Sequence, residues 1–216
     1  MSRIVRFGAG SLEELAGVAA ELSVSRLLLV TSRRGAALSE RLPVEAVYDG
    51  VRSHVPVETV GEAAAVAEEV GVECLVGLGG GSAIDTCKAV AVELAGRGRP
   101  VRTIAVPTTY AGAEWTPFYG VRNESRRTKA GGSDEAARPA AAIYDPELTL
   151  ELPRAPSGGT ALNALAHCAE ALYVRGRNAT ADRHALCGAR TIGYVLPLVL
   201  ADGRDLYARS RLLEGA

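Results

Sequence analysis

The chain has 216 residues, 48% of them hydrophobic, and its formal net charge at pH 7 is −1. Such a charge gives no general attraction to nucleic acid, and no apolar run approaches the roughly 20 residues that cross a bilayer. The N-terminal segment carries charges where a signal peptide needs an apolar stretch. We therefore expect a cytoplasmic protein with a sizeable core and with neither a nucleic-acid nor a membrane partner.

Cysteine and lysine are both scarce. The four cysteines are widely spaced and form no C-x-x-C pair: Cys74, Cys87, Cys168 and Cys187. This spacing indicates neither a zinc knuckle nor a redox motif, so we expect buried, reduced thiols. Among the 24 basic residues only Lys88 and Lys129 are lysines. A lysine chosen for its chemistry is one explanation, and a genome-wide arginine bias is the other.

The first 150 residues alternate short β-branched segments with amphipathic Ala- and Glu-rich ones, the pattern of βα units on a parallel sheet. Predicted strands cover 26–30, 45–49, 73–78, 103–109 and 140–145, and predicted helices cover 57–71 and 83–96. Gly71 is the expected C-cap of the first helix and Ser82 the expected N-cap of the second. Residues 110–139 lack helical periodicity and predict a hairpin or a long excursion over the sheet edge.

Beyond this region the pattern is helical, with helices predicted over 160–174 and 180–201, the second interrupted at Pro197. The Pro- and Gly-rich segment 153–159 separates an α/β dinucleotide-binding domain over 1–155 from a helical domain over 156–216. Two helices and a polar tail leave little to cover an apolar helix. We therefore expect an incomplete helical domain that more chain, another subunit or the α/β domain must cover.

The segment GLGGGSAIDTCKAV, residues 77–90, carries the first candidate site. A glycine-rich turn between a strand and a helix lets backbone N–H groups approach a phosphate, and Gly80, Gly81 and Ser82 are placed for this. Asp85 follows one turn into the helix. The spacing misses the usual dinucleotide fingerprint, and a tight turn that needs positive φ is the alternative interpretation.

Two later segments strengthen the first interpretation. IAVPTTYAGAEWTP places Thr108 and Thr109 at the carboxyl end of a predicted strand, where open α/β sheets bind their ligands. ALNALAHCAEAL sets Asn163 and His167 four residues apart, on one face of a helix.

With these motifs in order, the chain resembles the iron-containing alcohol dehydrogenase superfamily, and within it the maleylacetate reductases. The resemblance covers nearly the whole chain and rests on HVPVE, LGGGSAIDTCKAV, PTTYAG and LNALAH. It implies a dehydroquinate synthase-like architecture, in which an α/β dinucleotide-binding domain is followed by a helical domain. It also implies NADH or NADPH as cofactor, a small-molecule substrate and a homodimer.

The resemblance assigns cofactor contacts residue by residue. The matching positions are Gly80, Gly81, Ser82, Asp85, Thr108, Thr109, Thr116 and Lys129. Where the family has an acid for the adenosine ribose, this chain has Ser32 and Arg33, and an arginine can pair with a 2′-phosphate. We therefore expect NADPH to be tolerated as well as NADH.

Metal-dependent members hold iron or zinc with an aspartate and three histidines. Asn163 stands at the aspartate's place and His167 at the place of the first histidine. A neutral amide is a poorer ligand for a divalent cation than a carboxylate. We therefore expect no catalytic metal, with a metal-dependent alcohol dehydrogenase as the alternative.

The implied reaction is hydride transfer from NAD(P)H to the C=C bond of 2-maleylacetate, which gives 3-oxoadipate in aromatic-compound degradation. His167 and Asn163 are the candidates for the substrate and enolate side. His54 is expected to be packed and non-catalytic, and His184 has no assigned role. Because family members continue beyond the position of Ala216, a fragment with weak or no turnover is expected. A non-catalytic nucleotide-binding module or a partner-dependent subunit is the alternative.

Overall fold

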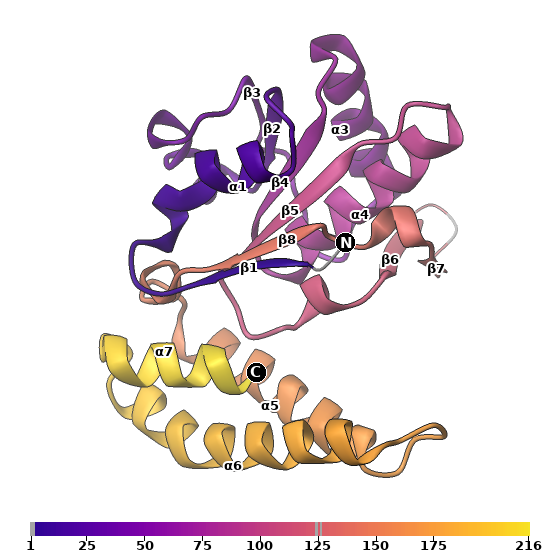
Figure 1. Ribbon diagram of the computed structural model, residues 1–216. Helices are drawn as coiled ribbons and strands as arrows, with labels where there is room; N and C mark the ends of the chain where they lie inside the picture. Colours follow the sequence, from indigo (N-terminus) through magenta and orange to yellow (C-terminus); the bar gives the residue numbers. More distant parts are fainter. Residues whose placement is uncertain (1–2, 124, 126) are drawn as a thin grey trace. The chain divides into compact units, whose positions relative to one another are not determined.

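A computed structural model describes residues 3–123, 125 and 127–216, without the side chain of Lys129. It divides into two compact units (Figure 1). The first unit contains the chain up to Phe7, Ser11–Pro107 and Ala113–Tyr144, and the second contains Gly8–Gly10, Thr108–Gly112 and Asp145–Ala216.

The first unit is built on a six-stranded sheet with the order β1-β8-β5-β4-β2-β3. The strands are β1 (Ile4–Phe7), β2 (Leu27–Val30), β3 (Ala46–Tyr48), β4 (Cys74–Gly79), β5 (Arg102–Pro107) and β8 (Ala141–Tyr144). Every pairing is parallel, so all carboxyl ends lie at one edge. Gly79 at the end of β4 pairs with Pro107 at the end of β5. The predicted parallel α/β class is confirmed.

Helices cover both faces of this sheet. They are α1 (Leu15–Glu21), α2 (Arg33–Ala36), α3 (Val57–Val70) and α4 (Gly81–Gly96). Figure 1 shows α3 and α4 on one face and α1 on the other, as right-handed crossovers require when the connections run in opposite directions across the sheet. The α3 helix ends at Gly71 with φ of 66°, the predicted left-handed C-cap. The N-cap of α4 is Gly80 and not the predicted Ser82.

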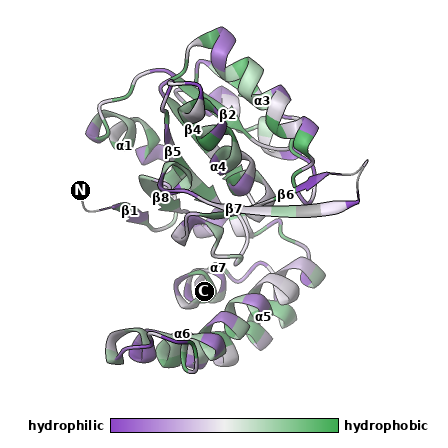
Figure 2. Cartoon of the chain, turned by 90° about the vertical axis from the view of Figure 1, so that its right-hand side faces the viewer, coloured by the Kyte–Doolittle hydropathy of each residue, from purple (hydrophilic) through white to green (hydrophobic). Residues whose placement is uncertain are grey.

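The core of the first unit lies between the sheet and helices α3 and α4, and Figure 2 shows apolar residues gathered along the central strands. Two glycines of β4 allow α4 to pack closely on its strand. A Cβ on Gly77 would lie 3.0 Å from Cys87 Sγ, and one on Gly79 would lie 2.9 Å from Ala83 Cβ. Gly79 also has φ of 149°. The glycine-rich segment therefore serves helix packing as well as the turn itself.

Two elements lie outside the central strands. The first, β1, was not predicted, and it adds a parallel edge strand beside β8. The second is the predicted hairpin, in which β6 (Phe118–Asn123) pairs with β7 (Thr128–Ser133) in antiparallel fashion. Short 3-10 helices connect the elements of the chain: η1 (Ser11–Glu14), η2 (Ser39–Arg41), η3 (Ala113–Trp115), η4 (Glu135–Ala137) and η5 (Pro146–Thr149).

The expectation of buried thiols holds for only part of the set. Cys74 and Cys87 are buried, Cys168 is half-buried and Cys187 is exposed. Burial raises the pKa of the Cys74 thiol to about 12, which keeps it protonated and unreactive at neutral pH.

The second unit contains α5 (Arg154–Ala171), α6 (Ala179–Ala201) and α7 (Leu206–Gly215), and α6 packs against the other two. The start of α5 lies at Arg154 and not at residue 160, since Pro153 is its N-cap and Pro156 lies in the first turn, where proline is tolerated. Helix α6 continues through Pro197, where an interruption was predicted. The predicted polar tail forms α7, capped by the Asp205 carboxylate, which accepts a hydrogen bond from Ala208 N.

Within the described part of the chain, α6 is the one helix long and apolar enough to cross a membrane, with 23 residues and a mean hydropathy of 1.3. The sequence analysis expected no apolar run of this length, whereas α6 passes the test by length and composition. Helices of soluble domains reach the same length and composition. This finding alone therefore assigns no membrane role to α6.

Candidate cofactor site

The turn between β4 and α4 has the geometry of an anion-binding cradle. Gly80 is the N-cap, with φ of −78° and ψ of −170°, and no side chain caps the first turn of α4. The first N–H groups of a helix have no partner within it, and the helix dipole favours negative charge there. Gly80, Gly81 and Ser82 are only half-buried. The turn therefore fits a diphosphate at the carboxyl edge of the sheet.

A second loop contacts this turn. The His54 N–H donates a hydrogen bond to Ser82 Oγ at 3.3 Å. His54 and Val55 have positive φ values of 63° and 50°, and for a β-branched valine this conformation is strained. The side chain of His54 is exposed, so the expectation that it is packed is wrong. Its backbone N–H contacts the turn.

The turn after β2 carries the residues expected beside the adenosine ribose. Thr31 is buried, and its Oγ1 donates a hydrogen bond to Leu78 O at 2.8 Å. Ser32, Arg33 and Arg34 are exposed. Neither arginine forms an ion pair with the residues that the structure describes, so both guanidinium groups are free to meet a phosphate.

Asp85 and Lys88 lie on α4, behind the turn. One carboxylate oxygen of Asp85 accepts a hydrogen bond from Gly120 N at 3.3 Å, and the other lies 3.4 Å from Lys88 Nζ. Lys88 is fully buried. Burial lowers its pKa, and the Asp85 carboxylate opposes that shift. The predicted cofactor-side acid is therefore already tied to the β6-β7 hairpin and to a buried cation.

A buried carboxylate, Glu114, lies in η3, two residues before Thr116. It accepts a hydrogen bond from Tyr144 Oη at 2.8 Å, and its backbone oxygen accepts one from Arg3. The Arg3 guanidinium lies 4.4 Å from the centroid of the Trp115 ring. Burial raises the pKa of Glu114, and Tyr144, Arg3 and other donors oppose the shift. Thr116 is thus in a segment whose start is firmly anchored.

In the second unit, Thr108 and Thr109 open a loop that a buried tyrosine secures. The Thr109 hydroxyl oxygen is buried and has no hydrogen-bond partner among the described residues, which suits a group that a ligand would satisfy. Tyr110 N–H donates to Thr160 Oγ1 at 3.3 Å, and Tyr110 Oη accepts from Arg209 at 3.1 Å.

Arg209 of α7 connects this loop to the rest of the second unit. Only 1% of its surface is exposed. Besides Tyr110, it donates hydrogen bonds to Ser157 Oγ at 2.7 Å, Leu152 O at 2.9 Å and Gly203 O at 2.9 Å. One guanidinium therefore joins the threonine loop, the start of α5 and the start of α7.

The candidates for the substrate side lie on α5. Asn163 and His167 are both exposed, and His167 Nδ1 lies 3.0 Å from a Glu170 carboxylate oxygen. No group of three or more His, Cys, Asp or Glu side chains that could hold a metal ion occurs among the described residues. His184 is also exposed. The side chain of Lys129 lies outside the described residues, although its backbone belongs to β7.

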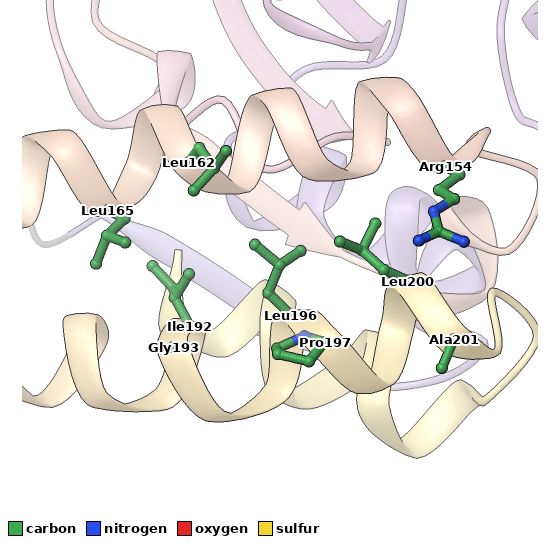
Figure 3. Close-up of a pocket in the computed structure, with 9 residues that line it drawn as sticks. All are labelled: Arg154, Leu162, Leu165, Ile192, Gly193, Leu196, Pro197, Leu200 and Ala201. Atoms are coloured by element: carbon green, nitrogen blue, oxygen red, sulfur yellow. The ribbon is translucent and has the colours of Figure 1, made fainter.

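A groove of about 470 Å³ runs between α5 and α6 (Figure 3). Its walls are formed by Arg154, Leu162, Leu165, Ile192, Gly193, Leu196, Pro197, Leu200 and Ala201. The figure shows the leucine and isoleucine side chains pointing between the two helices. With a single guanidinium among apolar groups, this groove offers no acid-base pair for catalysis.

Comparison with known proteins identifies the family of this chain. The family model for iron-containing alcohol dehydrogenase matches residues 2–146. The chain belongs to the iron-containing alcohol dehydrogenase family. It is 38% identical over 218 residues to the maleylacetate reductase of Burkholderia cepacia, an alignment that covers 98% of this chain and 60% of that protein. The chain thus spans about 60% of the length of the curated relatives it matches.

Solved structures of similar proteins share the fold. The maleylacetate reductase of Agrobacterium tumefaciens aligns with a TM-score of 0.91 at 36% identity, over 100% of this chain and 62% of that one. The sulfoacetaldehyde reductase of Bifidobacterium kashiwanohense, solved in complex with NAD+, aligns with a TM-score of 0.91 at 26% identity, over 99% and 64%. The dehydrogenase architecture expected from the motifs is therefore confirmed.

Sequence reasoning missed three buried groups of this family member: Lys88, Glu114 and Arg209. Lys88 had a signal, because lysine is scarce in this chain. Glu114 and Arg209 had none, since charged residues in polar segments are usually solvated. Their partners lie 30 and 99 residues away in sequence, so only the folded chain brings them together.

Proposed function

We propose that the chain carries the NAD(P)H-binding part of a maleylacetate reductase, which transfers hydride to the C=C bond of 2-maleylacetate and forms 3-oxoadipate. The observation that carries the proposal is the uncapped N-terminus of α4 after a glycine turn, in a chain whose relatives include maleylacetate reductases. The reaction would belong to aromatic-compound degradation.

The residues have distinct parts in this reaction. A bound nicotinamide would supply the hydride. The N–H groups that follow Gly80 would bind the diphosphate, and the unpartnered Thr109 hydroxyl would donate to or accept from the cofactor. His167 and Asn163 would offer hydrogen bonds to the enolate that hydride addition leaves. A substrate with two carboxylates also needs cationic groups around it.

The proposed reaction is tested by extending the chain to the length of its relatives. We expect the 216-residue chain to oxidise NADH with maleylacetate weakly or not at all, because a cleft enzyme needs both walls to exclude water. A chimera that joins it to the part of the B. cepacia relative that it does not match should turn over at about 1–1000 s⁻¹. A folded chimera that binds NADH and leaves maleylacetate unreduced would contradict the proposed substrate.

Cofactor choice should depend on the turn after β2. We expect NADPH to bind about as tightly as NADH, because Arg33 can pair with the 2′-phosphate. Arg33→Asp should weaken NADPH by about tenfold or more, since it replaces a charge-assisted contact by repulsion, and leave NADH within about twofold. Fluorescence titrations with both nucleotides measure this, with Arg41→Asp as a surface control. A hundredfold preference of the wild-type chain for NADH would show the assignment to be wrong.

We also propose that the reaction uses no metal. The donor set supports this, since Asn163 stands where metal-dependent members have an aspartate. A neutral amide binds divalent cations more weakly than a carboxylate does. Protein purified without chelators should contain less than about 0.1 iron or zinc per chain, and EDTA should leave NADH binding unchanged. One iron or zinc per chain in the wild-type protein, together with loss of that metal in the His167→Ala variant, would contradict the proposal.

The relatives are bacterial enzymes, which supports a proposal about the setting of this chain. We propose a cytoplasmic homodimer that acts on a small molecule and binds neither nucleic acid nor membrane. Light scattering that gives a monomer mass near 22.5 kDa at working concentration would contradict the dimer.

A further inference from the structure

Lys88 has an unusual environment for a lysine. It is fully buried in α4, two turns after the glycine turn. Lysine ammonium groups normally stay in water, because burying an unpaired charge is costly. A buried lysine in a chain with only two lysines among 24 basic residues therefore needs partners, and the structure supplies them.

The ammonium has three acceptors for its three N–H donors. Lys88 Nζ donates to Phe118 O at 2.8 Å and also to Ala113 O, and it lies 3.4 Å from an Asp85 carboxylate oxygen. The two backbone oxygens belong to the two ends of one segment, Ala113–Phe118. Lys88 thus fastens both ends of this segment to the helix that begins at the diphosphate turn.

The segment contains one of the predicted cofactor contacts. Thr116, a predicted cofactor contact, lies between the two anchored carbonyls, and Gly120 just beyond donates to the same Asp85. An arginine would not serve here, because its planar guanidinium is larger and cannot place three N–H groups around one point. The compact ammonium fits the three converging oxygens.

We propose that Lys88 is a positioning residue for cofactor binding, which holds Asp85 and the segment Ala113–Phe118 in the arrangement that the nicotinamide side of NAD(P)H requires. The proposal rests on the proposed function. Without the ammonium, the backbone oxygens of Ala113 and Phe118 lose the hydrogen bonds that tie them to α4, so the segment is released from the helix.

Trp115 makes the proposal measurable, because it is the single tryptophan of the chain and lies inside this segment. Its emission reports the segment's position without cofactor, and energy transfer from Trp115 to bound NADH reports binding. The variants are Lys88→Met, Lys88→Gln, which keeps a neutral donor, and Arg97→Met. The last one is the control, since it removes a cation at the other end of α4 whose ion pairs, among the described residues, are with Glu68 and Glu93.

In Lys88→Met we expect a shifted Trp115 emission maximum before any cofactor is added and at least tenfold weaker NADH binding. Lys88→Gln should fall between Lys88→Met and the wild type, and Arg97→Met should stay within twofold of the wild type.

A folded Lys88→Met with unchanged emission and NADH affinity overturns the proposal. If both Lys88 variants fail to fold by circular dichroism, Lys88 is a structural residue and the proposal is equally wrong. Failure of the wild-type chain to bind NADH would instead refute the proposed function. The Trp115 emission shift would still test whether Lys88 holds the segment Ala113–Phe118 in place.

Discussion

Replacing Arg209 by methionine is expected to lower the free energy of unfolding by about 3 kcal/mol. The side chain is buried and donates to four oxygen atoms of the second unit. Methionine fills a similar volume but leaves these acceptors without a donor, and each unsatisfied buried group costs about 1–3 kcal/mol. Some of that cost is recovered because a buried charge is removed and hydroxyl groups can turn.

Urea unfolding followed by far-ultraviolet circular dichroism measures this change. Arg211→Met is the matched control, because Arg211 lies on the same helix and, among the described residues, pairs with the exposed Glu214. An exposed pair contributes at most about 1 kcal/mol. Equal losses in the two variants would show that the Arg209 network does not stabilise the second unit.

Gly79→Ala is expected to weaken NADH binding by at least tenfold and to destabilise the first unit by about 1–3 kcal/mol. The new Cβ would lie 2.9 Å from Ala83 Cβ at a φ of 149°. Since Ala83 belongs to the first turn of α4, relief of this clash moves the N–H groups of the diphosphate cradle. The change acts on the backbone that binds the cofactor, not on a side chain.

The control for this variant is Gly96→Ala, at the other end of α4. A Cβ there meets no atom within 4 Å, so this substitution should be neutral or slightly stabilising. Calorimetric titration with NADH and chemical denaturation measure both effects. If Gly79→Ala binds NADH as the wild type does, the cradle lies elsewhere in the chain.

The central strands and the glycine turn could be predicted because their signals are local. Leu27–Val30 and Cys74–Gly79 are short apolar runs bounded by turn residues, and α3 ends at a glycine in the expected conformation. The β1 strand could not be predicted from Ile4–Phe7 alone. Its partner in the sheet is Ala141–Tyr144, so pairing across the length of the unit decides its conformation, not its own sequence.

The predicted helix boundaries near proline and glycine residues were wrong. The helix was expected to begin at residue 160, after the Pro- and Gly-rich residues 153–159, whereas these residues form the N-cap and first turns of α5. Proline is compatible with the first turn of a helix, where its missing N–H would have no partner. Pro197 is accommodated inside α6 close to its end, so the helix continues although one hydrogen bond is lost.

The glycine turn of the candidate site could be predicted from the sequence, but the side chains that hold the neighbouring segments could not. Glycine and serine at the end of a strand indicate a cradle by their chemistry alone. The groups that hold the neighbouring segments, Lys88 and Arg209, depend on backbone oxygens of Phe118 and Leu152. No residue type in the sequence marks a backbone acceptor, so these supports become visible only in the folded chain.

Hydrogen-deuterium exchange of the 216-residue chain with and without NADH tests most directly whether the turn between β4 and α4 holds the cofactor. The first N–H groups of α4 lack partners in the helix and should exchange quickly in the free protein. We expect NADH to slow exchange in a peptide spanning residues 77–85 and to leave the α5–α6 groove unchanged. NADH bound at saturation with no slowing in residues 77–85 would contradict the assignment of this turn.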